Sequence, residues 1–200
     1  NLHYQPGAIV EHLRGHADMR VCFSFEPDLL GTGGALRRAA WFLDEQPFWV
    51  VNTDIAADLD AAPLRHAFSR RRAIAALWMD PERGPRTVEL RDGLVHDFRS
   101  RRAGAPDTAT FCGLQLISPR LLDFVPASGF STLVDAYEAA GRAGERVAGV
   151  IVPHAFWADL GDPSAYRATH AEVARRAAEG EPGGRLMDPQ RVQSPGALRR

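Results

Sequence analysis

Two aspartates in this chain lie where a carboxylate could work in a site. Asp54 follows the apolar run at 48–51, and such a run is typical of a strand buried on both faces. Ligands of open α/β sheets bind beyond the carboxyl ends of the strands, so Asp54 would face a crevice, although an Asp in a turn can equally cap the next helix. Asp159 lies in FWADLGDP (156–163), where Asp162 is explained as the cap of the following helix and Asp159 is not. The two residues are therefore candidates for carboxylate chemistry.

A glycine-rich segment, LGTGGAL at 30–36, separates an expected strand at 20–25 from an expected helix at 35–43. Glycines let backbone N–H groups approach a ligand closely, and a helix N-terminus favours acceptor groups. The segment does not fit GxGxxG, because position 36 is Leu, and it lacks the Gly-Lys pair of a phosphate-binding P-loop. It is thus either a ligand-contacting loop of another kind or a purely structural turn, which is the more common case.

Composition restricts the partners of this chain. Its 200 residues suit one domain with a substantial core, and the formal net charge is −1. This balance indicates no nucleic-acid or membrane partner. All 24 basic residues are arginine, so any cation of this chain that binds phosphate must be an arginine.

The two cysteines, Cys22 and Cys112, lie in separate apolar stretches without CxxC spacing. This argues against a disulfide framework or a structural zinc site, and predicts two buried thiols in a reducing compartment. No run approaches the roughly 18 apolar residues of a membrane helix, and no leader pattern opens the sequence. The expected location is the cytoplasm.

Alternating strand and helix patterns predict an α/β fold with a mostly parallel sheet. A hairpin with an Asp-Gly turn is expected at 86–98, and residues 180–200 are too rich in Gly, Pro, Arg and Gln to pack, which predicts a disordered tail after a domain at 1–179. Further strands are expected at 48–51, 73–79, 108–117 and 146–152, and helices at 8–14, 60–71, 119–124, 131–143 and 163–179.

Five segments, taken in order, resemble the sugar-nucleotide pyrophosphorylases, the nucleotidyltransferases that make NDP-sugars. They are EPDLLGTGGAL (26–36), PFWVVNTD (47–54), the DP…DGLVHDF region (80–98), FCGLQLISPRLLDFVP (111–126) and GERVAGVIVPHAFWADLGDPSAYRATH (144–170). Mannose-1-phosphate guanylyltransferases and N-acetylmuramate-1-phosphate uridylyltransferases are the members that the chain resembles most.

The resemblance implies a three-layer α/β/α fold with a Rossmann-like mixed sheet and transfer of NMP from an NTP to a sugar 1-phosphate. Asp54 and Asp159 match the carboxylates that bind Mg²⁺ in the family. The other matches are Gly31, Thr32, Gly33 and Asn52 at the nucleotide, and Gly113 at the sugar. In such a transfer the protein mainly positions groups and neutralises charge, so no protein nucleophile is needed.

The chain departs from the family pattern after the hairpin, where Arg99 and its neighbours replace a Glu-Lys-Pro motif. Arg99 is the candidate cation at the sugar phosphate, although a run of arginines in a polar loop is more often a solvated face.

It also departs at the start, because nothing resembles the first strand and the glycine-rich loop that wraps the triphosphate. We therefore expect a domain that lacks the first strand and transfers nucleotide poorly as this fragment alone. The alternative is a catalytically weak nucleotide-sugar sensor or regulatory subunit. The sequence does not name the base, the sugar or the oligomeric state.

Overall fold

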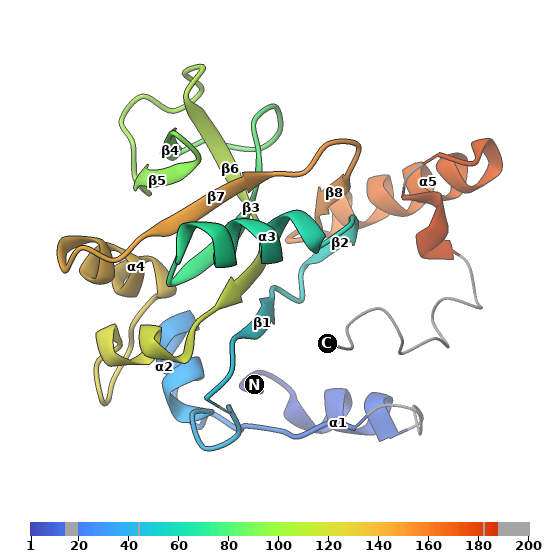
Figure 1. Cartoon of the computed structure of the whole chain (residues 1–200). Helices are drawn as coiled ribbons and strands as arrows, with labels where there is room; N and C mark the ends of the chain where they lie inside the picture. The colour runs from blue at the N-terminus through green and yellow to red at the C-terminus, as the bar shows by residue number, and fades with distance from the viewer. Residues whose placement is uncertain (15–19, 44, 182, 188–200) are drawn as a thin grey trace.

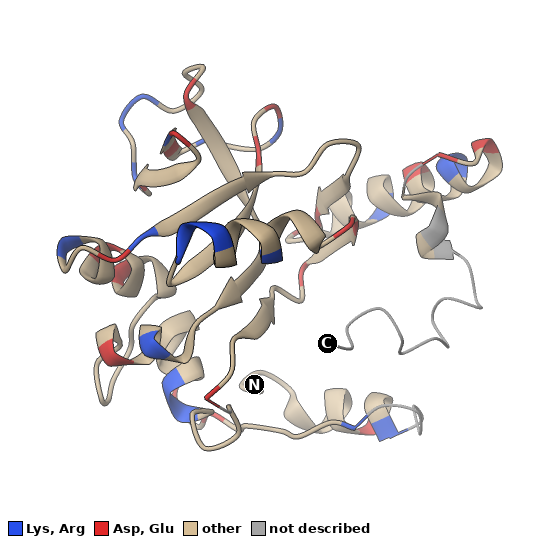
Figure 2. Ribbon diagram, in the orientation of Figure 1, with Lys and Arg blue, Asp and Glu red and all other residues tan. Residues whose placement is uncertain are grey.

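A six-stranded sheet forms the centre of the computed structural model, which describes residues 1–14, 20–43, 45–181 and 183–187 (Figure 1). Its strands lie in the order β1-β6-β3-β7-β5-β4, and β4 also pairs with the first residues of β6. The core strands contain few charged residues, so both faces of the sheet can be buried (Figure 2). The strands are β1 (Phe48–Val51), β3 (Ala75–Asp80), β4 (Val88–Arg91), β5 (Leu94–Asp97), β6 (Thr108–Ile117) and β7 (Val147–Ile151).

The sheet is mixed, as expected, but the prediction that it is mostly parallel was wrong. Among the described strands only β3 and β7 pair in parallel, while β6 runs antiparallel to both β1 and β3. A parallel neighbour needs a long crossover connection, and α4 (Leu133–Arg142) supplies one on the way to β7. β6 follows the β4–β5 hairpin without a crossover helix and therefore enters the sheet in the opposite direction.

Helices cover both faces of the sheet, which confirms the three-layer arrangement. On one face, α4, α2 (Gly31–Arg38) and the 3₁₀ helix η1 (Pro119–Phe124) pack on a core centred on Ile74, Leu77 and Ile117. On the other face, α3 (Ala62–Arg71) packs on a core that contains Trp78 and Cys112.

Several local predictions were confirmed. Ser118 caps η1 with Pro119 behind it, Asp162 caps α5 (Pro163–Glu179), and Asp92 and Gly93 take the positive φ angles of the predicted Asp-Gly turn. Burial raises the pKa of the Cys112 thiol, as expected for a structural cysteine.

Two predictions near the N-terminus were wrong. Residues 20–25 form no strand, and their β-pairing in the described chain is a single parallel bridge between Leu2 and Phe25. Cys22, which was expected to be buried, is therefore exposed. The glycine segment was expected as a loop before a helix at 35–43, but Gly31 already begins α2. The preceding helix, α1 (Pro6–Arg14), contains no buried residue.

A small ribbon, β2 (Ile55–Asp58) with β8 (Phe156–Asp159), extends the fold beyond the large sheet. α5 follows β8 and reaches away from the sheet (Figure 1). After α5 the chain forms a 3₁₀ helix, η2 (Gly184–Met187), within the segment that was predicted as a tail. The buried carboxylate of Asp58 accepts a hydrogen bond from Gly183 N, which fixes this turn; the rest of the predicted tail lies outside the described residues.

Candidate functional site

A cavity of about 330 Å³ opens at the carboxyl end of β1, between this strand, α2 and the N-terminal residues. It brings together Gly31, Thr32, Asn52 and Asp54, four of the residues that the sequence singled out. Gly31 and Thr32 lie about 20 residues before Asn52 and Asp54 in the sequence, so the folding of the chain brings the two pairs together. The remaining lining residues are Asn1, Glu26, Leu29, Ala35, Leu36, Val50, Val51, Thr53 and Leu133.

The glycine segment forms one wall because its glycines allow α2 to lie against the start of α4. Gly33 N and Gly34 N both donate to the carbonyl of Ser131, at 2.9 and 3.4 Å. A Cβ atom on Gly33 would lie 2.8 Å from Ser131 Oγ and 3.0 Å from the Thr132 backbone. Glycine is thus required here by packing, and the N–H groups of Gly33 and Gly34 are already used by this contact.

Thr32 is held in the same contact, since its Oγ1 accepts a hydrogen bond from Leu133 N at 2.9 Å. α4 begins here with a reciprocal capping box between Thr132 and Asp135. Thr32 therefore has a structural partner in addition to its place in the cavity wall.

Glu26 is a residue of this cavity that the sequence interpretation did not select. It is 1% exposed, and its carboxylate accepts hydrogen bonds from Asn1 Nδ2 at 2.7 Å and Leu30 N at 3.2 Å. A buried carboxylate with such partners joins the N-terminus to the loop that precedes α2. The sequence signal was only a Glu at the start of a turn-rich segment.

A bulge in β6 places Gly113 against Asn52. Between Leu77 and Met79 of β3 the register with β6 shifts, and Gly113 takes a φ of +82°. Its carbonyl accepts a hydrogen bond from Asn52 N at 2.8 Å, and a Cβ atom on Gly113 would lie 3.0 Å from Asn52 Cβ. Bulges of this kind bend a strand locally, and this one lies beside the residue at which β1 ends.

Asp54 and Asp159 are brought side by side by the β2–β8 ribbon. Asp159 is the register partner of Ile55, and Asp54 O accepts a hydrogen bond from Leu160 N at 2.7 Å. Asp54 lies in the turn before β2 begins, so the alternation of side chains along a strand does not fix its direction. Both carboxylates are exposed, and Asp159 Oδ1 accepts from Gly161 N at 2.8 Å.

The chemistry of this donor pair fits Mg²⁺. Among the described residues no group of three or more metal-ligand side chains converges. Mg²⁺ does not require such a group, because proteins usually bind it through one or two carboxylates together with substrate phosphates and waters.

Among the described residues, no cationic side chain lines the cavity. Its lining residues in the described chain include Glu26 and Asp54 but no arginine, and the protein has no lysine. The charged lining is therefore negative, which opposes binding of a bare triphosphate.

Arg99 lies elsewhere. It does not line this cavity, and its guanidinium forms ion pairs with Asp135, at 2.8 Å, and with Glu138 on the exposed side of α4. These carboxylates raise the pKa of Arg99. The structure thus does not bring Arg99 together with the other predicted site residues.

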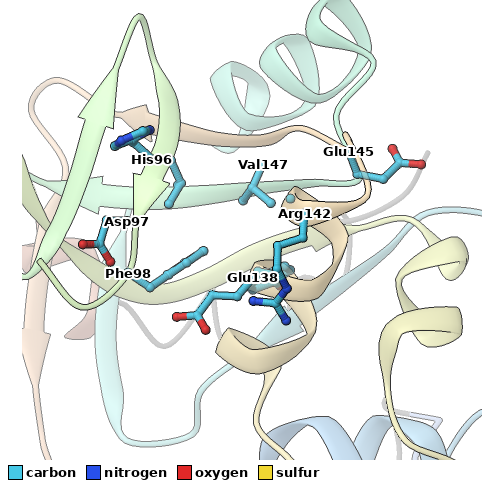
Figure 3. A pocket seen from close by; sticks show the side chains of 10 residues that line it. His96, Asp97, Phe98, Glu138, Arg142, Glu145 and Val147 are labelled. Atoms are coloured by element: carbon cyan, nitrogen blue, oxygen red, sulfur yellow. The ribbon is translucent and has the colours of Figure 1, made fainter.

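A larger cavity, of about 420 Å³, lies between β5 and the C-terminal half of α4 (Figure 3). Two of its carboxylates are already paired, Glu138 with Arg99 and Glu145 with Arg120. Its labelled polar side chains point in different directions rather than toward one point, as Figure 3 shows for His96 and Arg142. It therefore makes a weaker candidate for chemistry than the cavity at Asp54.

The comparisons with known proteins agree on one class of enzyme. No family model matches the chain. It is 29% identical to an N-acetylmuramate alpha-1-phosphate uridylyltransferase of Caulobacter vibrioides, over 87% of the chain and 76% of that protein. It is 26% identical to a probable mannose-1-phosphate guanylyltransferase of Arabidopsis thaliana, over 82% of the chain and 52% of that protein.

The chain is a relative of the sugar-1-phosphate nucleotidyltransferases. Solved structures support the same fold. One is a putative glucose-1-phosphate thymidylyltransferase from Bacillus anthracis, with a TM-score of 0.66 at 14% identity. The match covers 83% of the present chain and 71% of the Bacillus chain. An inositol-1-phosphate CTP transferase from T. maritima matches 82% of the chain and 69% of its own, with a TM-score of 0.65 at 12% identity.

These relatives are longer than the chain. It spans about half the length of the Arabidopsis guanylyltransferase and 42% of one from Xenopus laevis. Within the described residues, none of the helices combines the length and the apolar character needed to cross a membrane.

Proposed function

We propose that this chain contributes the nucleotide and metal site of an enzyme that transfers NMP from an NTP to a sugar 1-phosphate, releasing pyrophosphate. The observation that carries the proposal is the cavity at the end of β1, which gathers Gly31, Thr32, Asn52 and Asp54. Asp159 does not line this cavity, but it lies at the end of β8 beside the turn that carries Asp54. The class of the relatives supports the reaction type.

Each part of the site has a role in this proposal. The backbone at Gly31 and Thr32 lies against the base, and Asn52 lies between the cavity and the β6 bulge that faces the sugar. Asp54 and Asp159 hold Mg²⁺, which when bound neutralises charge on the phosphates. The reaction is an in-line attack by the sugar-phosphate oxygen on the α-phosphorus, so correct placement of both substrates is the main task of the protein.

We propose further that the chain alone catalyses this reaction poorly. No arginine lines the described cavity, so no side chain there offsets the charge of the triphosphate. In addition, β1 is the edge strand of the described sheet, and Val51 is 53% exposed. The cavity runs between this free edge and Asn1 and Glu26, which is where a further strand of the domain would lie.

The test is pyrophosphate release with Mg²⁺, using UTP, GTP, CTP and dTTP, each with several sugar 1-phosphates. The protein encoded by the complete reading frame should release pyrophosphate with one preferred NTP, and the 200-residue chain should release very little. Robust release by the 200-residue chain would refute the proposed dependence on further residues. If the complete protein binds nucleotide sugars but releases no pyrophosphate with any pair, the sensor or regulatory alternative is supported instead.

A further inference from the structure

A hydrogen bond from Arg83 reaches the strand that carries Asp159. Arg83 lies in the turn between β3 and β4, and its Nη1 donates to the carbonyl oxygen of Trp157 at 3.0 Å. Trp157 is two residues before Asp159 in β8. No motif in the sequence had selected Arg83.

β8 is a short strand that lies outside the large sheet. It has four residues, and β2 is its strand partner among the described strands. The Trp157 side chain is buried in the core under α3, which fixes the depth of the strand. The Arg83 bond acts on the backbone and can fix the position of β8 along the sheet. Hydrogen bonds from charged groups are the stronger ones.

The turn that carries Arg83 is itself held firmly. Asp80 Oδ1 accepts from the backbone N–H groups of Glu82 and Arg83, both at 2.8 Å. Thr110 of β6 donates from Oγ1 to the Arg83 carbonyl at 2.6 Å and accepts from Arg86 N at 2.8 Å. The backbone of Arg83 is therefore fixed, and its side chain extends from a defined position. A residue that positions another element needs such an anchor.

We infer that Arg83 is a positioning residue, which holds β8 so that Asp159 lies beside Asp54 at the metal site. This inference rests on the proposed function, because it assumes that the two aspartates bind a metal ion. Arg83 acts through the Trp157 carbonyl and not by contact with the ion.

Binding of Tb³⁺ tests the inference without catalysis. Tb³⁺ is a hard cation that prefers oxygen ligands, as Mg²⁺ and Ca²⁺ do, and nearby tryptophan excites its luminescence, so Trp157 beside Asp159 serves as the donor. The assay is a Tb³⁺ titration in phosphate-free buffer with the wild-type chain, D54N, D159N, R83M, R83K and R65M. Arg65 is exposed on α3 and serves as the control for loss of one positive charge.

The sign of the effect separates positioning from simple electrostatics. Loss of a positive charge near the aspartates would by itself tighten the binding of a cation. Positioning predicts the opposite: R83M should weaken Tb³⁺ binding by about tenfold or more, the size expected when one hydrogen bond from a charged group is lost. R83K can still donate to the carbonyl and should stay within about twofold of the wild-type chain, as should R65M.

The outcomes are distinct. Unchanged or tighter binding by R83M, while D159N loses binding, overturns the role of Arg83 and leaves the metal pair intact. Equal binding by D54N, D159N and the wild-type chain overturns the metal pair and the inference together. Circular dichroism checks that each variant is folded, and R83A replaces R83M if the latter does not fold.

Discussion

At the scale of single residues, the glycines of the Gly31–Gly34 segment show how one residue type can serve both packing and a site. Gly33 lets α2 approach the backbone at Ser131 and Thr132, and that approach places Gly31 and Thr32 in the wall of the cavity. The requirement for glycine therefore has a packing cause that holds whether or not a nucleotide binds.

This packing predicts that Gly33→Ala destabilises the chain. Its Cβ would lie 2.8 Å from Ser131 Oγ and 3.0 Å from the Thr132 backbone, so α2 and α4 must separate. Overpacking of this kind costs about 1–3 kcal/mol in the free energy of unfolding, as measured by urea denaturation.

Gly141→Ala is the matched control. Gly141 lies within α4, and a Cβ atom there would meet no other atom within 4 Å. This change should be neutral or should stabilise by up to about 1 kcal/mol, because Ala favours the helix. Equal effects of the two substitutions would contradict the packing role of Gly33.

At the scale of elements, five charged side chains at the C-terminal end of α5 and just after it form a network of ion pairs. Arg175 pairs with Glu172, Glu179 and Glu181, and Arg176 pairs with Glu172 and Glu181. Hydrogen bonds, first from Arg175 and then from Arg176, lower the pKa of Glu172 to about 2 from an ordinary value of 4.5.

The lowered pKa predicts that acid weakens the end of α5. A group whose pKa is lower in the folded state contributes stability above its ordinary pKa, and this contribution is lost as the pH falls from 4.5 toward 2. The protection factors of the amides over residues 172–179, which compare the exchange rate with the intrinsic rate at the same pH, should therefore fall across this window. E172Q should show a smaller change, and an identical pH dependence in E172Q would show that the pairs do not stabilise the helix.

Elements with strong local signals could be predicted from the sequence, and those that depend on distant contacts could not. β6 matched its expected range of 108–117, because this segment consists mainly of apolar and β-branched residues and stands between clear turn signals. β2 and β8 were not expected, since IAAD and FWAD are short and become strands only by pairing with each other. The prediction of a mostly parallel sheet was wrong for the same reason, because strand direction also depends on pairing between distant segments.

The site followed the same rule. Gly31, Thr32, Asn52 and Asp54 were selected because each lies in a local pattern, and the structure gathers these four around one cavity. Glu26 and Arg83 were missed because their partners, Asn1 and Trp157, lie 25 and 74 residues away. Arg99 was selected as a phosphate cation from a local run of arginines, but its pairs with α4 could not be seen in the sequence.

At the scale of the whole molecule, apolar surface is concentrated in the N-terminal quarter. Nine of the thirteen exposed large apolar side chains of the described chain lie between Tyr4 and Val51, and Tyr4 and Trp41 are 78% and 69% exposed. A concentration of exposed apolar side chains is typical of a surface that associates with other molecules.

This distribution predicts that the 200-residue chain binds the dye ANS in its folded state and self-associates as its concentration rises. Replacing Tyr4, Trp41 and Phe42 with Ser should reduce both effects, whereas replacing Phe130 and Tyr166, exposed elsewhere, should have a smaller effect. Fluorescence titration and light scattering give the two readouts. A monomer without ANS binding would contradict the interpretation of this surface.

The central claim is that Asp54 and Asp159 form the metal-binding pair of a nucleotidyltransferase. The most direct measurement is the rate of Mg²⁺-dependent pyrophosphate release by the protein from the complete reading frame, compared with its D54N and D159N variants. We predict that each variant loses about 100-fold or more in kcat, because each removes a ligand that neutralises phosphate charge. D60N, at an exposed aspartate outside the cavity, should keep the wild-type rate. Variants of Asp54 and Asp159 that stay within about threefold of wild type, less than 1 kcal/mol, would contradict the account.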